Sequence, residues 1–255
     1  EEVSVIVLTS GTDYTGFNKI LESIQKNTTR PCNVIVVNNS VNTPPKEFDN
    51  IINNHLTNKL RFKVHITFKD LPVGEARNEG VKLIPEHVKY FCFIDDDALI
   101  LGRYSYEMDW LDFLYNKFNS EPDIAAIAPI YTWFDPLKTD CVSVSCMFTS
   151  KKVWNRVGGF DPVFGNKQKG TWGYEDVDWS YRAKRLGYKL KSVETPYFPF
   201  YHIDTTLKEK TEERSRGLEK AYTILMEKYK DDNVDNVMRT VYPLTKDELE
   251  IRGTK

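Results

Sequence analysis

The chain has 255 residues, of which 40% are hydrophobic and 28% charged, and its formal net charge is −2. This composition is typical of a globular protein with a substantial core, built as one large α/β domain or two small ones. The balanced charge gives no electrostatic argument for binding nucleic acid or an anionic membrane surface, and no apolar run reaches the roughly 18 residues of a transmembrane helix.

The four cysteines, Cys32, Cys92, Cys141 and Cys146, form neither a CxxC pair nor a zinc pattern. Buried free thiols in a reducing compartment are therefore expected. The sequence shows no signal peptide, so we expect a cytoplasmic protein, or a domain trimmed from a larger or membrane-associated enzyme.

The first third of the chain alternates predicted strands and helices. Residues 3–9 and 33–37 are apolar runs typical of buried strands, and a helical pattern at 15–27 separates them. This order predicts a right-handed βαβ unit and a parallel sheet, in which ligands bind beyond the carboxyl ends of the strands. The residues at these ends are Thr9, Ser10, Asn38 and Asn39. Ordinary turn chemistry is the alternative role for the two asparagines.

A glycine-containing segment begins the next part of the pattern, after a predicted helix at 44–58 and a predicted strand at 60–68. In residues 71–80 (LPVGEARNEG), Gly74 permits close approach of the backbone at a helix start. Arg77 offers a forked set of donors that suits a phosphate or a nearby carboxylate. The alternative is a tight helix–sheet contact with a surface arginine.

Three carboxylates, Asp95, Asp96 and Asp97, follow the short aromatic strand predicted at 90–94. Adjacent acids repel each other, and a divalent cation would relieve that repulsion. Mg²⁺ and Mn²⁺ favour oxygen ligands and are commonly shared between carboxylates and substrate phosphates. In an extended segment Asp95 and Asp97 point to the same side. The alternative is a solvated acidic turn.

The second half contains further predicted helices and strands. The helices are expected at 107–119, 151–157 and 206–230, and the strands at 124–130, 141–148, 188–193 and 197–203. A turn at 158–162 and a loop at 163–173 connect two of these elements.

A second polar centre lies in residues 172–179 (WGYEDVDW). A helix over 175–186 would place Asp176 at the inward end of a stripe, and a helix N-terminus favours the charged carboxylate. The rest of that stripe is Trp179, Ser180, Ala183 and Leu186. Trp172 could form an apolar wall for a ring-shaped substrate. The alternative is that Glu175 and Asp176 only favour the helix start. His202 ends the last predicted strand, where a structural role is the alternative.

The order of these motifs resembles that of the GT-A glycosyltransferases, most of all family 2. The matching segments are VSVIVLTS at 3–10, VIVVNNS at 34–40, GEARNEGV at 74–81, FIDDD at 93–97, VGGFDPVFG at 157–165 and WGYEDVDWSYRAKRLGY at 172–188. The last of them also resembles the WGGED-type segment of animal galactosyl- and N-acetylgalactosaminyltransferases.

The resemblance implies an α/β fold of GT-A type, with a Rossmann-like, mostly parallel central sheet flanked by helices. A catalytic domain would span residues 1–204. Its nucleotide-binding half would be residues 1–97 and its acceptor-binding half residues 98–204. Residues 205–255 would form a helical C-terminal extension and a candidate lid over the donor.

The implied reaction transfers a sugar from a nucleotide-sugar to a hydroxyl, on a glycan or another acceptor, in glycan biosynthesis. Asp95 and Asp97 would match the DxD motif that holds Mn²⁺ or Mg²⁺ against the diphosphate, with His202 as third metal ligand. Asp176 would be the general base, and Glu175 would contact donor or acceptor sugar. The donor would be bound by Thr9, Ser10, Asn38, Asn39, Gly74, Arg77, Asp95, Asp96 and Trp172.

Asn38 departs from the family, which commonly has aspartate there to accept a hydrogen bond from uracil. An amide oxygen can also accept that bond, so a UDP-sugar is favoured while guanosine and thymidine donors stay open. Asp176 favours inversion, although some relatives with a WGGE segment retain configuration.

Two other functions stay open. One is an inactive nucleotide- or sugar-binding module, which the presence of Asp95, Asp97, Asp176 and His202 together argues against. The other is a nucleotidyltransferase, which typically has a glycine-rich loop with Arg or Lys after the first strand. Residues 10–13 (SGTD) contain neither cation.

Overall fold

The computed structural model describes residues 3–42, 44, 46–55, 60–102, 108–129, 141–193, 198–202 and 212–232, without the side chains of Phe62 and His202. The strands are β1 (Val3–Thr9), β2 (Cys32–Asn38), β3 (Leu60–Ile66), β4 (Tyr90–Asp95), β5 (Ala98–Ile100), β6 (Ile124–Pro129), β7 (Cys146–Ser150), β8 (Lys189–Val193) and β9 (Phe200–His202). The helices are α1 (Tyr14–Asn27), α2 (Lys46–His55), α3 (Val73–Lys82), α4 (Trp110–Asn119), α5 (Lys151–Val157), α6 (Glu175–Arg185), α7 (Glu212–Lys228) and the 3₁₀ turn η1 (Lys167–Lys169).

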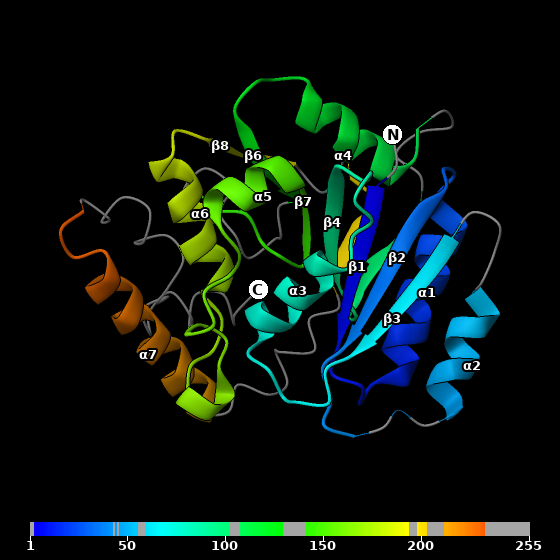
Figure 1. Ribbon diagram of the computed structural model, residues 1–255, viewed down its shortest axis with the longest axis horizontal. Helices are drawn as coiled ribbons and strands as arrows, with labels where there is room; N and C mark the ends of the chain where they lie inside the picture. Colours follow the sequence, from blue (N-terminus) through cyan, green and yellow to red (C-terminus); the bar gives the residue numbers. More distant parts are fainter. Residues whose placement is uncertain are drawn as a thin grey trace, which may run out of the picture.

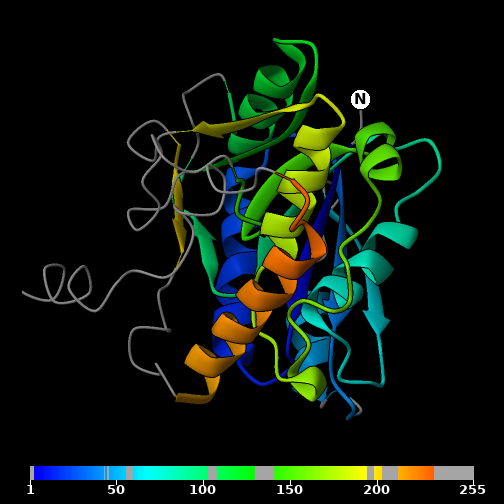
Figure 2. The same cartoon turned by 90° about the vertical axis from the view of Figure 1, so that its left-hand side faces the viewer.

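Seven strands form one central sheet in the order β3-β2-β1-β4-β7-β6-β8, and β5 pairs with β9 in a separate two-stranded sheet. Helices α1, α2 and α4 lie on one face of the central sheet and α3, α5 and α6 on the other (Figures 1 and 2). Four of the six strand pairings are parallel, and only β7 runs antiparallel to both of its neighbours. The expected mostly parallel α/β sheet is confirmed.

The carboxyl ends of the first parallel strands meet at one edge, as the βαβ pattern predicted. Thr9 lies opposite Asn38 in the β1–β2 pair, and Leu8 lies opposite Asp95 in the β1–β4 pair. These strands are apolar and buried almost throughout. Thr9, Asn38 and Asp95 therefore lie together where these strands leave the core.

Several boundaries differ from the sequence-based expectations. The strand predicted at 141–148 is found at 146–150, since the chain at 144–145 forms a turn beside α6. Helix α6 ends at Arg185, and Leu186 is exposed, so the predicted apolar stripe stops at Ala183. Residues 107, 130, 197, 203 and 206–211 of other predicted elements lie outside the described part.

Two apolar clusters support these layers. The main cluster fills both faces of the central sheet and includes the stacked indoles of Trp154 and Trp179. A smaller cluster joins α6 and α7. Its buried members are Cys141, Phe164, Tyr174, Val177, Tyr181, Ala221, Leu225 and Tyr229. Helix α7 is therefore packed on the body of the protein.

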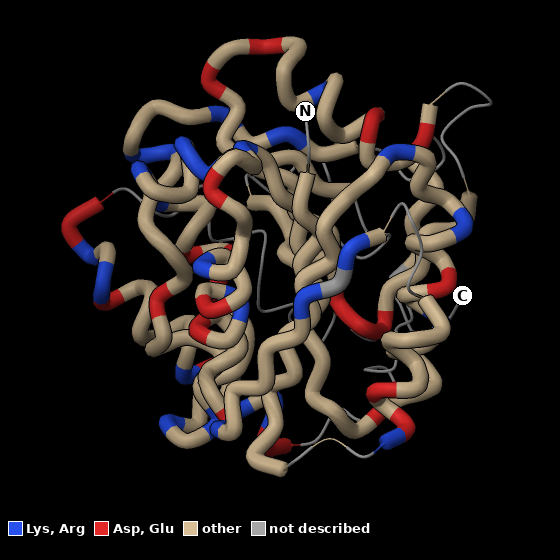
Figure 3. The backbone as a smooth tube through the Cα atoms, turned by 45° about the vertical axis from the view of Figure 1, so that its right-hand side comes forward, with Lys and Arg blue, Asp and Glu red and all other residues tan. Residues whose placement is uncertain are grey.

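All four cysteines are buried and free, as expected. Acidic and basic residues are interspersed along the described backbone rather than gathered on one face (Figure 3). Within the described ranges, none of the helices has both the length and the apolar character needed to cross a bilayer.

Candidate functional site

Asn38 is the most deeply buried polar residue at the ends of β1 and β2. Its side chain is fully buried, and neither its amide oxygen nor its amide nitrogen has a hydrogen-bond partner. Gly11 presses against it, because a Cβ there would lie 2.6 Å from the amide oxygen of Asn38. A buried amide without partners is costly. The amide of Asn38 therefore has hydrogen-bonding capacity that no residue in the described part of the structure uses.

The neighbouring polar residues have structural contacts. Asn39 donates its amide to the carbonyl of Leu71 (2.9 Å) and accepts from the Leu71 N–H (3.1 Å), so it fixes the loop before α3. Thr9 accepts from the N–H of Gly11 (3.1 Å), whereas the hydroxyl of Ser10 meets Thr12 at the surface (2.7 Å). Asn39 thus connects the end of β2 to the loop before α3, and the binding roles of Asn39, Thr9 and Ser10 stay predictions.

The three acids after β4 do not continue as a strand. Asp95 ends β4, while Asp96 and Asp97 form a turn into β5. The extended geometry assumed for Asp95 and Asp97 is therefore wrong. The chain turns here because β5 pairs with β9, a strand distant in the sequence, and not with the central sheet.

The acidic turn has the electrostatics of a cation site. Burial, with smaller contributions from the negative charges of Asp97, Asp95 and Asp13, raises the pKa of Asp96 to about 7, although a hydrogen bond from Thr9 lowers it. A carboxyl that is hard to ionise beside two others would be relieved by a bound cation. Oxygen donors of this kind suit Mn²⁺ or Mg²⁺.

The pairing of β5 with β9 brings His202 to the same turn. Ala98 lies opposite His202, so the histidine backbone is next to the residue that follows Asp97. The side chain of His202 lies outside the described part of the structure. In the ranges described, no three His, Cys, Asp or Glu side chains form a ready metal-binding group. The third-ligand role of His202 stays a prediction.

Arg77 is the central cation of the site and is not a surface residue. Its side chain is 5% exposed, and its guanidinium donates to Asp95 Oδ1 (2.6 Å) and Glu175 Oε1 (2.9 Å). Burial opposes its charge, but Asp95 and Glu175 more than offset this and raise the pKa of Arg77. Arg77 therefore joins the acidic turn after β4 to the start of α6.

The helix that carries Arg77 fits closely against the second half of the chain. A Cβ on Gly74 would lie 2.7 Å from Cβ of Phe160 and 3.4 Å from Cβ of Glu175. One turn later, Asn78 donates to the carbonyl of Phe160 and accepts from its N–H, both at 2.9 Å. Sequence reasoning gave Asn78 no role. Its place four residues after Gly74, on the same helix face, was the available signal.

Glu175 and Asp176 begin α6 and have different surroundings. Glu175 is 6% exposed, and its second oxygen, Oε2, has no hydrogen-bond partner. Asp176 is half-buried and accepts from the N–H groups of Val144 (3.3 Å) and Val177 (2.9 Å). Burial, followed by the charge of Glu175, raises the pKa of Asp176 to about 7, although Arg77 and the two N–H groups lower it. A carboxyl with this pKa can act as a base near neutral pH.

Trp172 is partly buried and packs against α7. Its backbone N–H donates to the carbonyl of Gly217 (3.1 Å), and the cations of Lys167 and Arg214 each lie 5.6 Å from the centroid of its ring. The predicted sugar wall would thus be an indole whose surroundings are partly occupied by these cations. That role stays a prediction.

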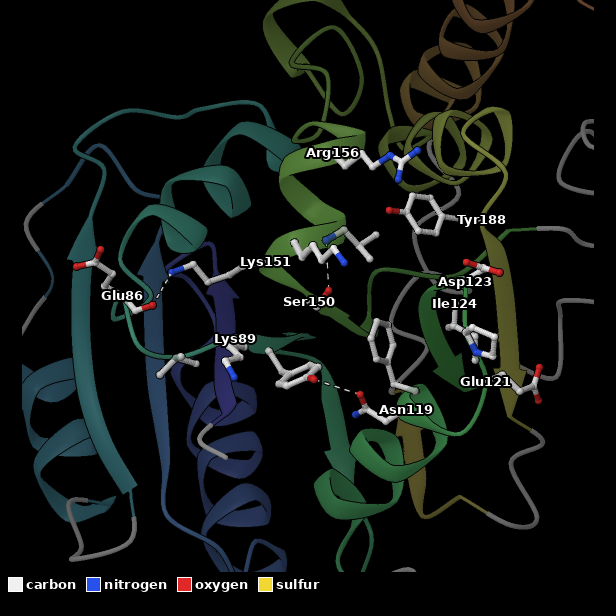
Figure 4. A pocket seen from close by; sticks show the side chains of 16 residues that line it. Glu86, Lys89, Asn119, Glu121, Asp123, Ile124, Ser150, Lys151, Arg156 and Tyr188 are labelled. Carbon is white, nitrogen blue, oxygen red and sulfur yellow. Dashed lines mark hydrogen bonds between the residues drawn. The ribbon is translucent and has the colours of Figure 1, made fainter.

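A pocket of about 670 Å³ lies at the opposite edge of the sheet, around the starts of β4 and α5 (Figure 4). Three of its charged side chains have partners within the protein. Lys151 approaches backbone carbonyls of residues 85 and 86, Arg156 lies over the ring of Tyr188, and Glu121 pairs with Lys191. None of the predicted site residues lines this pocket. The candidate site is the carboxyl edge.

No protein-family model and no curated protein matches the sequence. Solved structures do match its fold. A mannosyltransferase from Pyrobaculum calidifontis, solved with GDP-Man and Mn²⁺, is 17% identical with a TM-score of 0.58, covering 75% of this chain and 54% of its own. GalNAc-T7, solved with UDP, GalNAc and Mn²⁺, is 15% identical with a TM-score of 0.64, covering 91% and 48%. TarS from S. aureus is 14% identical with a TM-score of 0.55, covering 96% and 46%.

These similarities establish the fold. The chain spans about half the length of these three structures. The chain therefore has the GT-A fold of nucleotide-sugar glycosyltransferases.

Proposed function

We propose that the chain is a metal-dependent glycosyltransferase that moves a sugar from a nucleotide-sugar to an acceptor hydroxyl. The observation that carries this proposal is the convergence of two acidic groups on Arg77. The acidic turn at 95–97 lies on one side of the guanidinium and the Glu175–Asp176 pair on the other. One group suits a metal–diphosphate complex and the other an acceptor hydroxyl.

In this proposal Asp95, Asp97 and His202 hold Mn²⁺ or Mg²⁺. The metal would offset the negative charge of the leaving diphosphate. Mn²⁺ accompanies the nucleotides in the structures of the mannosyltransferase and of GalNAc-T7, which supports this choice. Asp96, whose pKa is raised by burial and by neighbouring carboxylates, is held near the donor by Thr9.

Asp176 is the proposed general base. The acceptor oxygen forms a bond to the anomeric carbon, the bond from that carbon to the diphosphate breaks, and the acceptor proton passes to Asp176. The two N–H groups of Val144 and Val177 orient its carboxylate. In-line attack assisted by this base inverts the anomeric configuration. Glu175, held by Arg77, is placed to contact the transferred or accepting sugar.

The donor base would meet Asn38. Its unpartnered amide offers one acceptor and two donors, which can pair with the N3–H and a carbonyl of uracil. A UDP-sugar is therefore our first choice, and a glycan is the proposed acceptor. Residues 1–204 would carry the reaction, and the buried free thiols support a reducing compartment such as the cytoplasm.

Thermal unfolding with UDP, GDP, TDP and CDP, each with and without Mn²⁺, tests the proposal. A ligand at about 100 times its Kd stabilises a protein by about 2.7 kcal/mol, so the expected result is a clear, Mn²⁺-dependent rise of Tm with one nucleotide. Product analysis with the corresponding donor then distinguishes the reactions. Free nucleoside diphosphate indicates glycosyl transfer, whereas pyrophosphate indicates nucleotidyl transfer. Stabilisation without any product would leave a binding module.

A further inference from the structure

The segment that carries the proposed base is held by α7 at three places, the first of which is Trp172. Gly217 of α7 lies so close to this indole that a Cβ there would be 2.3 Å from Trp172 Cδ1. The backbone N–H of Trp172 also donates to the carbonyl of Gly217. Only glycine permits this approach.

The second contact is made by Tyr174, which immediately precedes Glu175 and Asp176. Tyr174 has φ 71° and ψ −1°, the left-handed region, and Gly173 before it has φ 62°. This conformation is unfavourable for an aromatic residue and persists only where the surroundings enforce it. The ring is 4% exposed, and it lies 6.3 Å from the ring of Tyr222 on α7.

The third contact fixes the end of α7. The fully buried Asp178 accepts from Lys228 (2.6 Å) and from the hydroxyl of Tyr229 (2.7 Å), and it pairs with Arg182 (2.9 Å). Lys228 also reaches Asp161 (2.7 Å). A buried carboxylate with these partners anchors α7 firmly to α6.

We propose that Tyr174 is a positioning residue, whose ring, packed against α7, holds the left-handed turn that directs the Asp176 carboxylate to the Val144 N–H. Helix α7 is then a part of the catalytic unit rather than an appendage. The reason is local geometry. A change of φ at Tyr174 would swing both carboxylates that follow, away from Arg77 and from Val144. Its catalytic consequence rests on the proposed role of Asp176 as base.

The test compares three variants. Tyr174→Gly keeps a residue suited to φ 71° but removes the ring, and Tyr174→Phe keeps the ring. Tyr181→Ala is the matched control, because it removes another buried ring of the same cluster, 4.4 Å from Tyr229, without touching the turn. The first readout is the hydrogen-exchange rate of the Val144 amide, measured by NMR. This measurement does not require the protein to turn over a substrate. The second is kcat and the donor KM.

In Tyr174→Gly the Val144 amide should exchange about tenfold faster, as expected for the loss of one hydrogen bond. It should stay protected in Tyr174→Phe and in Tyr181→Ala. Where transfer is measurable, kcat should fall in Tyr174→Gly with the donor KM unchanged. Unchanged exchange in Tyr174→Gly, or equal acceleration in Tyr181→Ala, would overturn the proposal. If the wild-type protein transfers no sugar, the proposed function fails, and the exchange data still decide the role of Tyr174.

Discussion

Replacing Arg77 by methionine tests the central ionic link of the site. The substitution keeps much of the side-chain volume and removes both ion pairs. It leaves Asp95 and Glu175, whose side chains are 20% and 8% exposed, without their shared cation. Breaking a buried pair by removing one partner costs about 3–5 kcal/mol, because a charge stays buried and uncompensated. We expect a loss at the lower end of this range, since water reaches Asp95.

Urea unfolding measures this loss. With m of about 1–3 kcal/mol/M, a loss of about 3 kcal/mol lowers the midpoint by at least about 1 M. The deficit should shrink in acidic buffer, because a protonated carboxyl no longer leaves an unpaired charge. Arg77→Lys should recover part of the loss, since one ammonium supplies charge but not the fork that reaches both acids.

Arg185→Met is the matched control. Its guanidinium is 56% exposed and lies 3.4 Å from Asp232, and such surface pairs are worth about 0–1 kcal/mol. If Arg77→Met destabilises the protein no more than Arg185→Met does, the guanidinium does not bridge the two halves and our reasoning about the site is wrong.

Three further predictions address chemistry and packing. Asp176→Asn should lose about 10² in turnover while keeping donor affinity. The kcat of the wild type should fall below pH 7, because the base must be ionised, and a flat pH–rate profile would contradict this. The same variant should have a higher Tm than the wild type at pH 8 but not at pH 4. Folding raises the pKa of the Asp176 carboxyl from 3.8 to about 7, so the wild-type protein becomes less stable as the pH increases between these values, and asparagine removes this effect. Asp97→Ala should abolish Mn²⁺-dependent nucleotide binding with the fold intact, whereas the exposed Asp70→Ala should not; calorimetric titration with Mn²⁺ and nucleotide decides.

The sequence predicted the parts of the site that follow from regular structure. Buried strands in βαβ order place Thr9, Asn38 and Asp95 at one edge, and the structure confirms this placement. The helix start at Glu175 was also correct. These features depend on local periodicity and on the handedness of parallel connections, which a sequence records directly.

Contacts between distant segments were not accessible in this way. The sequence offered Arg77 a phosphate or a carboxylate, and only the fold shows that it spans Asp95 and Glu175. The turn at 96–97 depends on a strand about 100 residues later. Residues 141–145 (CVSVS) were predicted to be part of a strand, yet the Val144 N–H donates to the Asp176 carboxylate of α6. Which distant group a side chain or a backbone N–H contacts is decided by the tertiary structure and not by local sequence.

The small sheet formed by β5 and β9 has a consequence for folding. It joins residues 98–100 to residues 200–202, so it closes a loop of about 100 residues with only three paired positions. Closing such a loop costs conformational entropy, so β5 and β9 are expected to pair late in folding, after the neighbouring strands have paired. The βαβ units of β1, β2 and β3 can form on their own local contacts. We therefore expect β1, β2 and β3 to pair early in a refolding chain, and the acidic turn at 95–97 to reach its final conformation last.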